Sequence, residues 1–104
     1  MMPVREYIRD DGSNPFKQWF DSLNHQAAAK VTVALARLEA GNTSNVKWFS
    51  GIGEYRIDWG PGYRIYLVRE GGELIVLLGG GTKMRQQRDI SIARALAKEF
   101  RSRK

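Results

Sequence analysis

Residues 53–66 read Gly53-Glu54-Tyr55-Arg56-Ile57-Asp58-Trp59-Gly60-Pro61-Gly62-Tyr63-Arg64-Ile65-Tyr66. Apolar and polar side chains alternate on both sides of the central Gly-Pro-Gly, which is the pattern of two antiparallel strands joined by a tight turn. We therefore expect strands over residues 54–59 and 63–69. If the turn closes a simple hairpin, one face carries three apolar pairs: Trp59 with Tyr63, Ile57 with Ile65, and Tyr55 with Leu67. This face is predicted to be the core face of the hairpin.

The opposite face of the hairpin is predicted to be polar. Its cross-strand pairs are Asp58 with Arg64, Arg56 with Tyr66, and Glu54 with Val68. A register shifted by one residue would turn both arginines into the core, so the alternation constrains which residues share a face. Surface pairing of opposite charges accounts for such a face as well as a binding site does. The pattern alone leaves both interpretations open.

Helical and strand patterns surround the hairpin. We expect a first strand over residues 4–9, a helix that begins at Ser13-Asn14-Pro15, and a second helix over residues 25–40. Residues 42–50 are predicted to be a polar loop. Residues 74–78 are predicted to form the strand that follows the hairpin, and the last helix is expected from about Asp89. The sequence thus predicts an α+β fold with a single domain over residues 1–104. A helical hairpin packs on a mostly antiparallel sheet in β-α-α-β-β-β order, with a C-terminal helix.

Positive charge is concentrated at the C-terminal end. The net charge is +6, yet residues 1–82 carry nine Lys or Arg and nine Asp or Glu. Residues 83–104 carry eight Lys or Arg and two acidic residues. Such asymmetry indicates a polyanionic partner, either nucleic acid or an acidic protein, although a solvated basic tail gives the same count.

Several classes of site and location are not expected. The chain has no cysteine, its carboxylates are scattered, and its one histidine, His25, lies at a predicted helix start. We therefore expect no metal and no cofactor. Neither a signal peptide nor an apolar run of membrane-spanning length is visible, which predicts a cytoplasmic protein without membrane contact.

The segment that follows the predicted strand over residues 74–78 combines glycines with cationic side chains. Residues 79–89 read Gly79-Gly80-Gly81-Thr82-Lys83-Met84-Arg85-Gln86-Gln87-Arg88-Asp89. We expect the glycines to interrupt the regular structure, so that the backbone can approach a phosphate and the side chains can neutralise it. The spacing is not that of a nucleotide-binding P-loop.

Residues 53–66, together with Leu77 to Lys83 and Gln87 to Ile90, resemble the addiction module killer protein branch of the RelE/ParE toxins, close to HigB. The resemblance covers essentially the whole chain in order. It implies a toxin of a type II toxin–antitoxin system, paired with a helix-turn-helix antitoxin. For RelE-like members it also implies ribosome-dependent cleavage of mRNA and inhibition of translation. A ParE-like toxin that inhibits a protein such as DNA gyrase, and a simple nucleic-acid-binding module, remain as alternatives.

Site residues follow from this resemblance position by position. Arg64 matches the strand arginine that RelE-like nucleases use at the scissile phosphate, and Arg56 matches a basic position on the preceding strand. Lys83 and Arg85 fall where these toxins place further cations, and Glu54 is the candidate general base. Two positions depart from the family pattern, because Asp58 replaces a basic residue and Ile90 replaces a tyrosine. These departures leave the general acid and base open.

Further residues are predicted to contact RNA rather than to take part in the chemistry. They are polar or aromatic side chains near the predicted site or on the basic face of the last helix: Lys47, Tyr66, Gln86, Arg88, Arg94 and Lys98. An antitoxin that covers this surface is expected to present acidic side chains to it.

Overall fold

The structure, a computed structural model, describes residues 2–103 as a five-stranded mixed sheet with three α-helices. The strands are β1 (Val4–Glu6), β2 (Val46–Phe49), β3 (Ile52–Ile57), β4 (Tyr63–Glu70) and β5 (Leu74–Thr82). The helices are α1 (Pro15–Asp21), α2 (His25–Glu39) and α3 (Gln86–Ser102), and a 3-10 turn, η1 (Lys83–Arg85), precedes α3. The predicted α+β class is confirmed. Within residues 2–103, no helix is both long and apolar enough to cross a membrane.

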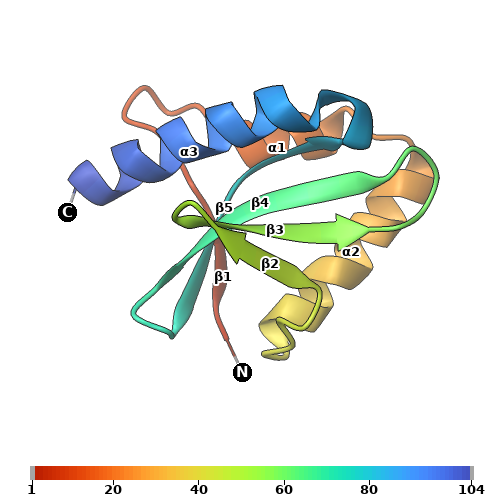
Figure 1. The fold of residues 1–104 in the computed structure, drawn as a ribbon, viewed down its shortest axis with the longest axis horizontal. Helices are drawn as coiled ribbons and strands as arrows, with labels where there is room; N and C mark the ends of the chain where they lie inside the picture. The colour runs from red at the N-terminus through yellow and green to blue at the C-terminus, as the bar shows by residue number, and fades with distance from the viewer. Residues whose placement is uncertain (1, 104) are drawn as a thin grey trace.

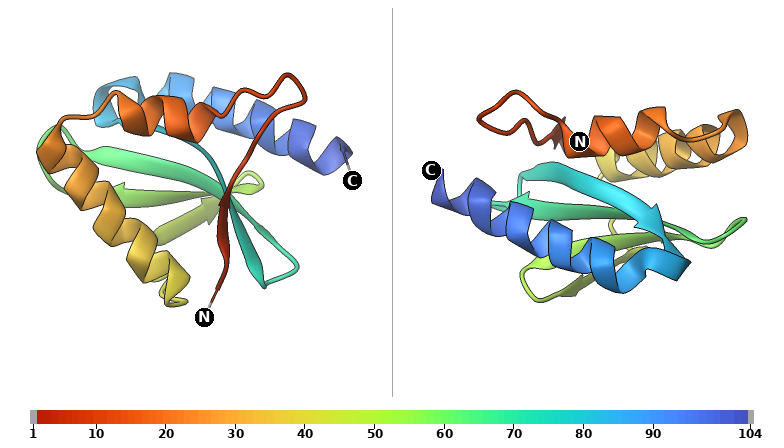
Figure 2. Two further views of the ribbon diagram at one scale, coloured as in Figure 1. Left: turned by 180° about the vertical axis from the view of Figure 1, so that it is seen from behind. Right: turned by 90° about the horizontal axis from the view of Figure 1, so that it is seen from above.

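The sheet lies between two helical layers. Its strand order is β1-β5-β4-β3-β2, with β1 parallel to β5 and the other neighbours antiparallel. Helices α1 and α2 cover one face, and α3 runs across the other (Figures 1 and 2). Each face has its own apolar cluster, one around Phe16 and Leu38 and one around Leu78 and Leu96. Surface ion pairing, one of the two interpretations of the polar hairpin face, is therefore wrong over much of that face, because α3 packs there.

The helix starts follow the sequence signals closely. Asn14 and Asn24 are the N-caps of α1 and α2, and their side chains accept hydrogen bonds from the backbone N–H groups of Lys17 and Ala27. Pro15 occupies the first helical position of α1, where a missing N–H costs nothing. The short connection between the two helices holds them as the predicted hairpin on one side of the sheet.

The β3–β4 pairing differs from the predicted register by two residues. Arg56 lies opposite Arg64, and Glu54 lies opposite Tyr66. Residues 58–62 form a longer connection than predicted, in which the backbone N–H of Gly62 donates to the carbonyl of Trp59 at 3.1 Å. Because strand side chains repeat every two residues, this shift changes partners and keeps every side chain on its predicted face.

Residues 42–50 are not the loop that was predicted, since β2 forms there and pairs with β3. Gly53 makes the pairing close-packed: a Cβ at this position would lie 2.8 Å from the Trp48 ring, and also 2.8 Å from side-chain atoms of Val46 and Leu67. The tight connection from β2 to β3 places Ser50 at a φ of 51°. The order is thus β-α-α-β-β-β-β-α, one strand more than expected.

The glycine run also behaves differently from the prediction. Gly79, Gly80 and Gly81 continue β5 and pair with β4. A Cβ at Gly80 would overlap the Trp19 ring, and a Cβ at Gly81 would overlap the Asp89 carboxylate. These two glycines make room for side chains packed on opposite faces of the strand. They do not form a phosphate-binding loop.

Candidate functional site

The carboxylate of Glu54 is the buried centre of the polar cluster on the α3 side of the sheet. Glu54 has an exposed fraction of 0%. One carboxylate oxygen accepts from Arg56 Nε at 2.8 Å, and the other accepts from Gln86 Nε2 at 2.9 Å, at the first residue of α3. Burial by itself would raise the pKa of Glu54, but these donors outweigh it and hold the pKa below its usual value. Glu54 is therefore an ionised group that fixes Arg56 and Gln86.

Arg64, on the neighbouring strand β4, is buried without a carboxylate partner. Its exposed fraction is 5%, and it forms no ion pair within residues 2–103. One terminal nitrogen, Nη1, donates to the carbonyl of Gly62 at 3.0 Å, while Nε has no partner among the described residues. A guanidinium keeps its positive charge at any ordinary pH. The site thus contains a fixed, uncompensated cation, and the surface ion pair between Arg64 and Asp58 that the alternation allowed is absent from the described residues.

A cavity of about 530 Å³ opens beside these arginines. It is lined by the β3–β4 connection, by the strand ends and by the start of α3: Arg56, Asp58, Trp59, Gly60, Pro61, Gly62, Arg64, Lys83 and Gln86. The backbone N–H of Lys83 donates to the carbonyl of Gly62 at 2.8 Å, which anchors the start of η1 to the connection. Three cations and one carboxylate, that of Asp58, therefore border one open hollow.

Tyr66 lies beneath the cluster with its hydroxyl close to the Glu54 carboxylate. The residue is 1% exposed, and its hydroxyl makes no hydrogen bond of ordinary geometry within residues 2–103. Burial, the negative charge of Glu54 and the closeness of its carboxylate to the hydroxyl raise the pKa of Tyr66 above its ordinary range, and the charge of Asp89 adds to this. Burial likewise raises the pKa of Asp89, against the nearby positive charges of Arg85 and Arg88. The ring of Tyr66 is therefore an internal wall of the site, not a surface on which a base can stack.

The structure gathers some predicted residues and separates others. Arg56, Arg64, Lys83 and Gln86 line one cavity with Glu54 behind them. Exposed Lys47 lies opposite Glu54 in the β2–β3 pair, at the edge of the same sheet face.

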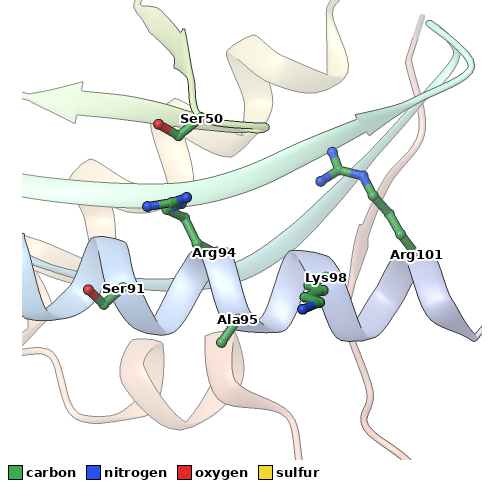
Figure 3. A pocket seen from close by; sticks show the side chains of 6 residues that line it. All are labelled: Ser50, Ser91, Arg94, Ala95, Lys98 and Arg101. Atoms are coloured by element: carbon green, nitrogen blue, oxygen red, sulfur yellow. The ribbon is translucent and has the colours of Figure 1, made fainter.

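The remaining predicted cations lie elsewhere on the surface. Arg85 and Arg88 are exposed and do not line the cavity, and their charges act on Asp89. Arg94 and Lys98 lie further along α3 and line a separate groove (Figure 3). Ile90 packs against the α3-side core.

Sequence reasoning missed two contributors to the site. The carbonyl of Gly62 accepts hydrogen bonds from both Lys83 and Arg64 and so holds them together. A Cβ at Gly62 would lie 2.8 Å from Arg64 Nη1, and its φ of 77° favours glycine, so the Gly-Pro-Gly pattern was the available signal. Gln86 was predicted to contact RNA, but its role as a donor to Glu54 depends on tertiary packing and has no local signature.

The arrangement is suited to holding and stabilising an anion. The guanidinium groups of Arg56 and Arg64 present planar donor arrays that match phosphate oxygens, and Lys83 adds an exposed point charge. The described residues contain no cluster of three potential metal ligands. Since both oxygens of Glu54 already accept hydrogen bonds, the site offers strong charge stabilisation and little free basicity.

Comparison with known proteins gives one informative relative. A protein of Haemophilus influenzae, described only as an uncharacterized protein, is 44% identical over 87 residues, which span 82% of this chain and 88% of the relative. No protein-family model matches the chain. The chain belongs to the same family as this Haemophilus influenzae protein.

Proposed function

We propose that this protein is the toxin of a type II toxin–antitoxin system, of the HigB-like branch of the RelE/ParE superfamily. In this proposal it acts in the cytoplasm as a ribosome-dependent, metal-independent mRNA endoribonuclease that inhibits translation. The observation that carries it is the buried, unpaired Arg64 beside a cavity that Arg56 and Lys83 also line. An unneutralised buried cation costs stability, so its placement at an open cavity favours a role in binding an anion.

The α+β architecture is compatible with the same assignment. A strand, a helical hairpin, an antiparallel strand series and a C-terminal helix follow each other, and β2 is an addition to the expected order. The Gly53–Tyr66 segment forms the β3–β4 hairpin, and Lys83 follows β5 directly. Lys83 thus lines one cavity with Arg56 and Arg64 of that hairpin.

The residues present define how cleavage would proceed. The 2′-oxygen of the RNA attacks the adjacent phosphorus, its proton passes to an acceptor, and the bond to the 5′-oxygen breaks as that oxygen gains a proton. Arg56 and Arg64 would stabilise the charge that develops on the phosphate oxygens, and Glu54 would keep Arg56 oriented. Because the pKa of Glu54 is lowered, it is a weak base near neutral pH, and correct positioning of the 2′-hydroxyl has to contribute much of the acceleration. A ribosome that holds the mRNA in an attack geometry supplies that positioning.

The proposed partners follow from the same surface. The mRNA and the ribosome would approach the cationic cavity, and a helix-turn-helix antitoxin would neutralise the toxin by covering it. The excess of positive charge in residues 83–104 favours fast association with either kind of anionic partner.

The decisive experiment replaces Arg64 with a neutral side chain of similar size, so that no packing void is left in the fold. Arg64→Ala would remove a buried side chain, so Arg64→Gln, which keeps most of the volume and removes the charge, is the sharper variant. We expect it to abolish growth arrest on induction at an unchanged soluble level, with a thermal unfolding midpoint equal to or above that of the wild type because a buried unpaired charge is removed. Arg69→Gln, an exposed arginine on the same strand, is the matched control and should arrest growth like the wild type. Equal arrest by wild type and Arg64→Gln would overturn the proposal.

A second function is favoured by one observation. Glu54 is engaged at both oxygens and Ile90 stands where the family has a tyrosine, so neither the candidate base nor a family-type tyrosine is free to transfer a proton. A non-catalytic, ParE-like toxin that inhibits a protein target such as DNA gyrase needs neither. Inhibition of gyrase supercoiling by the purified protein, without mRNA cleavage on ribosomes, would favour this function.

A further inference from the structure

A second groove runs between α3 and the connection from β2 to β3. It encloses about 470 Å³ and is lined by Ser50, Ser91, Arg94, Ala95, Lys98 and Arg101. Figure 3 shows Arg94 and Arg101 extending from α3 toward the strand connection, with the Ser50 hydroxyl on the far side. This groove shares no lining residue with the cavity at Arg64.

The charges of this groove are uncompensated. None of its lining residues is acidic, and Arg94 and Lys98 form no ion pair within residues 2–103. Arg101 donates from Nη2 to the backbone carbonyl of Gly51 at 2.7 Å, a neutral acceptor that fixes the side chain and leaves its charge. Three cations therefore face one hollow, and one of them is held in place.

Ser50 lines the side of the groove opposite α3, and its backbone adopts an unusual conformation. It is the one non-glycine residue with a positive φ, at 51°, among those that the structure describes. Asparagine and glycine adopt this conformation at lower cost, and such residues concentrate at functional sites. The hydroxyls of Ser50 and Ser91 are suited to donating to phosphate oxygens.

The groove lies on the same side of the sheet as the cavity at Arg64. Helix α3 borders both, with Gln86 at the cavity and Arg94 at the groove. Lys47, exposed on β2 opposite Glu54, lies on the strand that leads from the cavity side to Ser50. Lys47 thus adds one exposed cation on the strand between the cavity side and the groove.

We infer that this groove holds the sugar–phosphate backbone of the RNA strand whose scissile phosphate occupies the cavity at Arg64, an inference that rests on the proposed function. A single strand bound without regard to sequence needs a cationic groove that follows its backbone. A protein partner would need apolar anchors at the centre of its interface, and the only apolar residue lining this groove is Ala95. The composition of the groove therefore favours a nucleic-acid backbone over an acidic protein segment.

The test measures how RNA affinity depends on salt. The probes are uncleavable, fully 2′-O-methylated RNAs of three and twelve nucleotides, titrated against the full-length protein across ionic strengths. For a single strand, the slope of log affinity against log salt changes by about 0.7 for each phosphate contact. We expect Arg94→Gln/Lys98→Gln to reduce the slope for the longer RNA by roughly 1.4, the sum of two such contacts, and to leave the trinucleotide unchanged. The control, Arg5→Gln/Arg37→Gln, removes the same charge from exposed positions on β1 and α2 and should alter neither slope.

The outcomes separate this inference from the proposed function. An unchanged slope for the longer RNA, with the Arg64→Gln variant still failing to arrest growth, would overturn the groove assignment alone. Equal slope changes for both RNAs, or in the Arg5/Arg37 control, would also overturn it, because the effect would then reflect net charge. A loss of antitoxin binding with unchanged RNA binding would assign the groove to a protein. Absence of binding by either RNA to the wild type would overturn the groove assignment, whereas the proposed function itself is tested by the growth arrest of the Arg64→Gln variant.

Discussion

The three consecutive glycines of β5 offer a direct test of how the site is built. Gly79, Gly80 and Gly81 are the same residue type, all three pair with β4, and none of them has a positive φ. Their surroundings differ sharply, since a Cβ at Gly79 has nothing within 4 Å, while one at Gly80 meets Trp19 and one at Gly81 meets Asp89. Single alanine substitutions at the three positions should therefore have three different effects.

The magnitudes follow from the obstacles. Gly79→Ala removes freedom from the unfolded chain without a clash, and should stabilise by about 0.5 kcal/mol. Gly80→Ala pushes against the face of a packed indole ring, and overpacking of this kind costs roughly 1–3 kcal/mol. Gly81→Ala displaces the end of a short carboxylate side chain, which can rotate, so its cost should lie between the two. For a domain near this size, 1 kcal/mol corresponds to a shift of about 4 °C or more in the unfolding midpoint.

Thermal unfolding of the three variants, followed by circular dichroism, measures this order, and growth arrest measures the function. We expect the midpoint to rise slightly for Gly79→Ala and to fall most for Gly80→Ala. Gly79→Ala should also retain full growth arrest, because its backbone is part of the strand ladder. If Gly79→Ala abolished arrest while folding normally, the glycines would act as a flexible phosphate loop and the strand explanation would be refuted. Equal destabilisation by all three substitutions would refute the packing argument.

Three other predictions concern stability and cleavage. Tyr66→Phe removes a buried hydroxyl that makes no hydrogen bond of ordinary geometry, so the unfolding midpoint should stay level or rise, and a clear fall would mean that the hydroxyl donates to the nearby Glu54 carboxylate. Hydrogen bonds from Arg9 and Tyr7 lower the pKa of Glu99 from 4.5 to about 2, so the stability it contributes is complete above pH 4.5 and is lost as the pH falls toward 2. Glu99→Gln should make the free energy of unfolding depend less on pH between about 2 and 4.5, and the same pH dependence in variant and wild type would contradict this. Purified protein should cut mRNA on ribosomes and leave naked RNA intact, and efficient cleavage of naked RNA would show that the site activates its own nucleophile.

Alternation was the most reliable signal in the sequence. The two faces of the β3–β4 hairpin were predicted correctly although the register was not, because a two-residue shift preserves the faces. The length of the turn could not be read from Gly60-Pro61-Gly62. Residues 58 and 59 belong to the connection and not to β3, and the Trp59 ring stacks on the Tyr63 ring with their centroids 6.2 Å apart. Helix starts at Asn14 and Asn24 were accessible for a different reason, as capping is a local interaction.

Tertiary packing determined what the sequence could not predict. The basic face of α3 was visible, but its packing across the polar face of the hairpin was not, and this packing buries Glu54, Arg64 and Tyr66. The glycine run resembled a flexible loop because the side chains that fill the space beside it come from other elements. Trp19 of α1 lies against Gly80, and Asp89 of α3 lies against Gly81. The meeting of Arg56, Arg64 and Lys83 was therefore predictable, whereas their burial and hydrogen bonding, and the separation of Arg94 and Lys98 from them, were not.

Burial changes what the cluster means for function. In a solvated sheet face, Arg56 and Arg64 directly opposite each other would repel weakly and gain little from their neighbours. In the folded chain the two arginines differ: Arg56 is exposed and paired with Glu54, whereas Arg64 is buried and has only a backbone carbonyl and an unpartnered Nε. One carboxylate among these groups leaves an excess positive charge at the mouth of the cavity, where a phosphate would supply both the missing charge and the missing acceptor. The same charge is a liability to the free protein, because desolvation of an unpaired ion opposes folding. A site that is destabilising when empty and satisfied when an anion binds is the physical basis on which the proposed RNA chemistry stands.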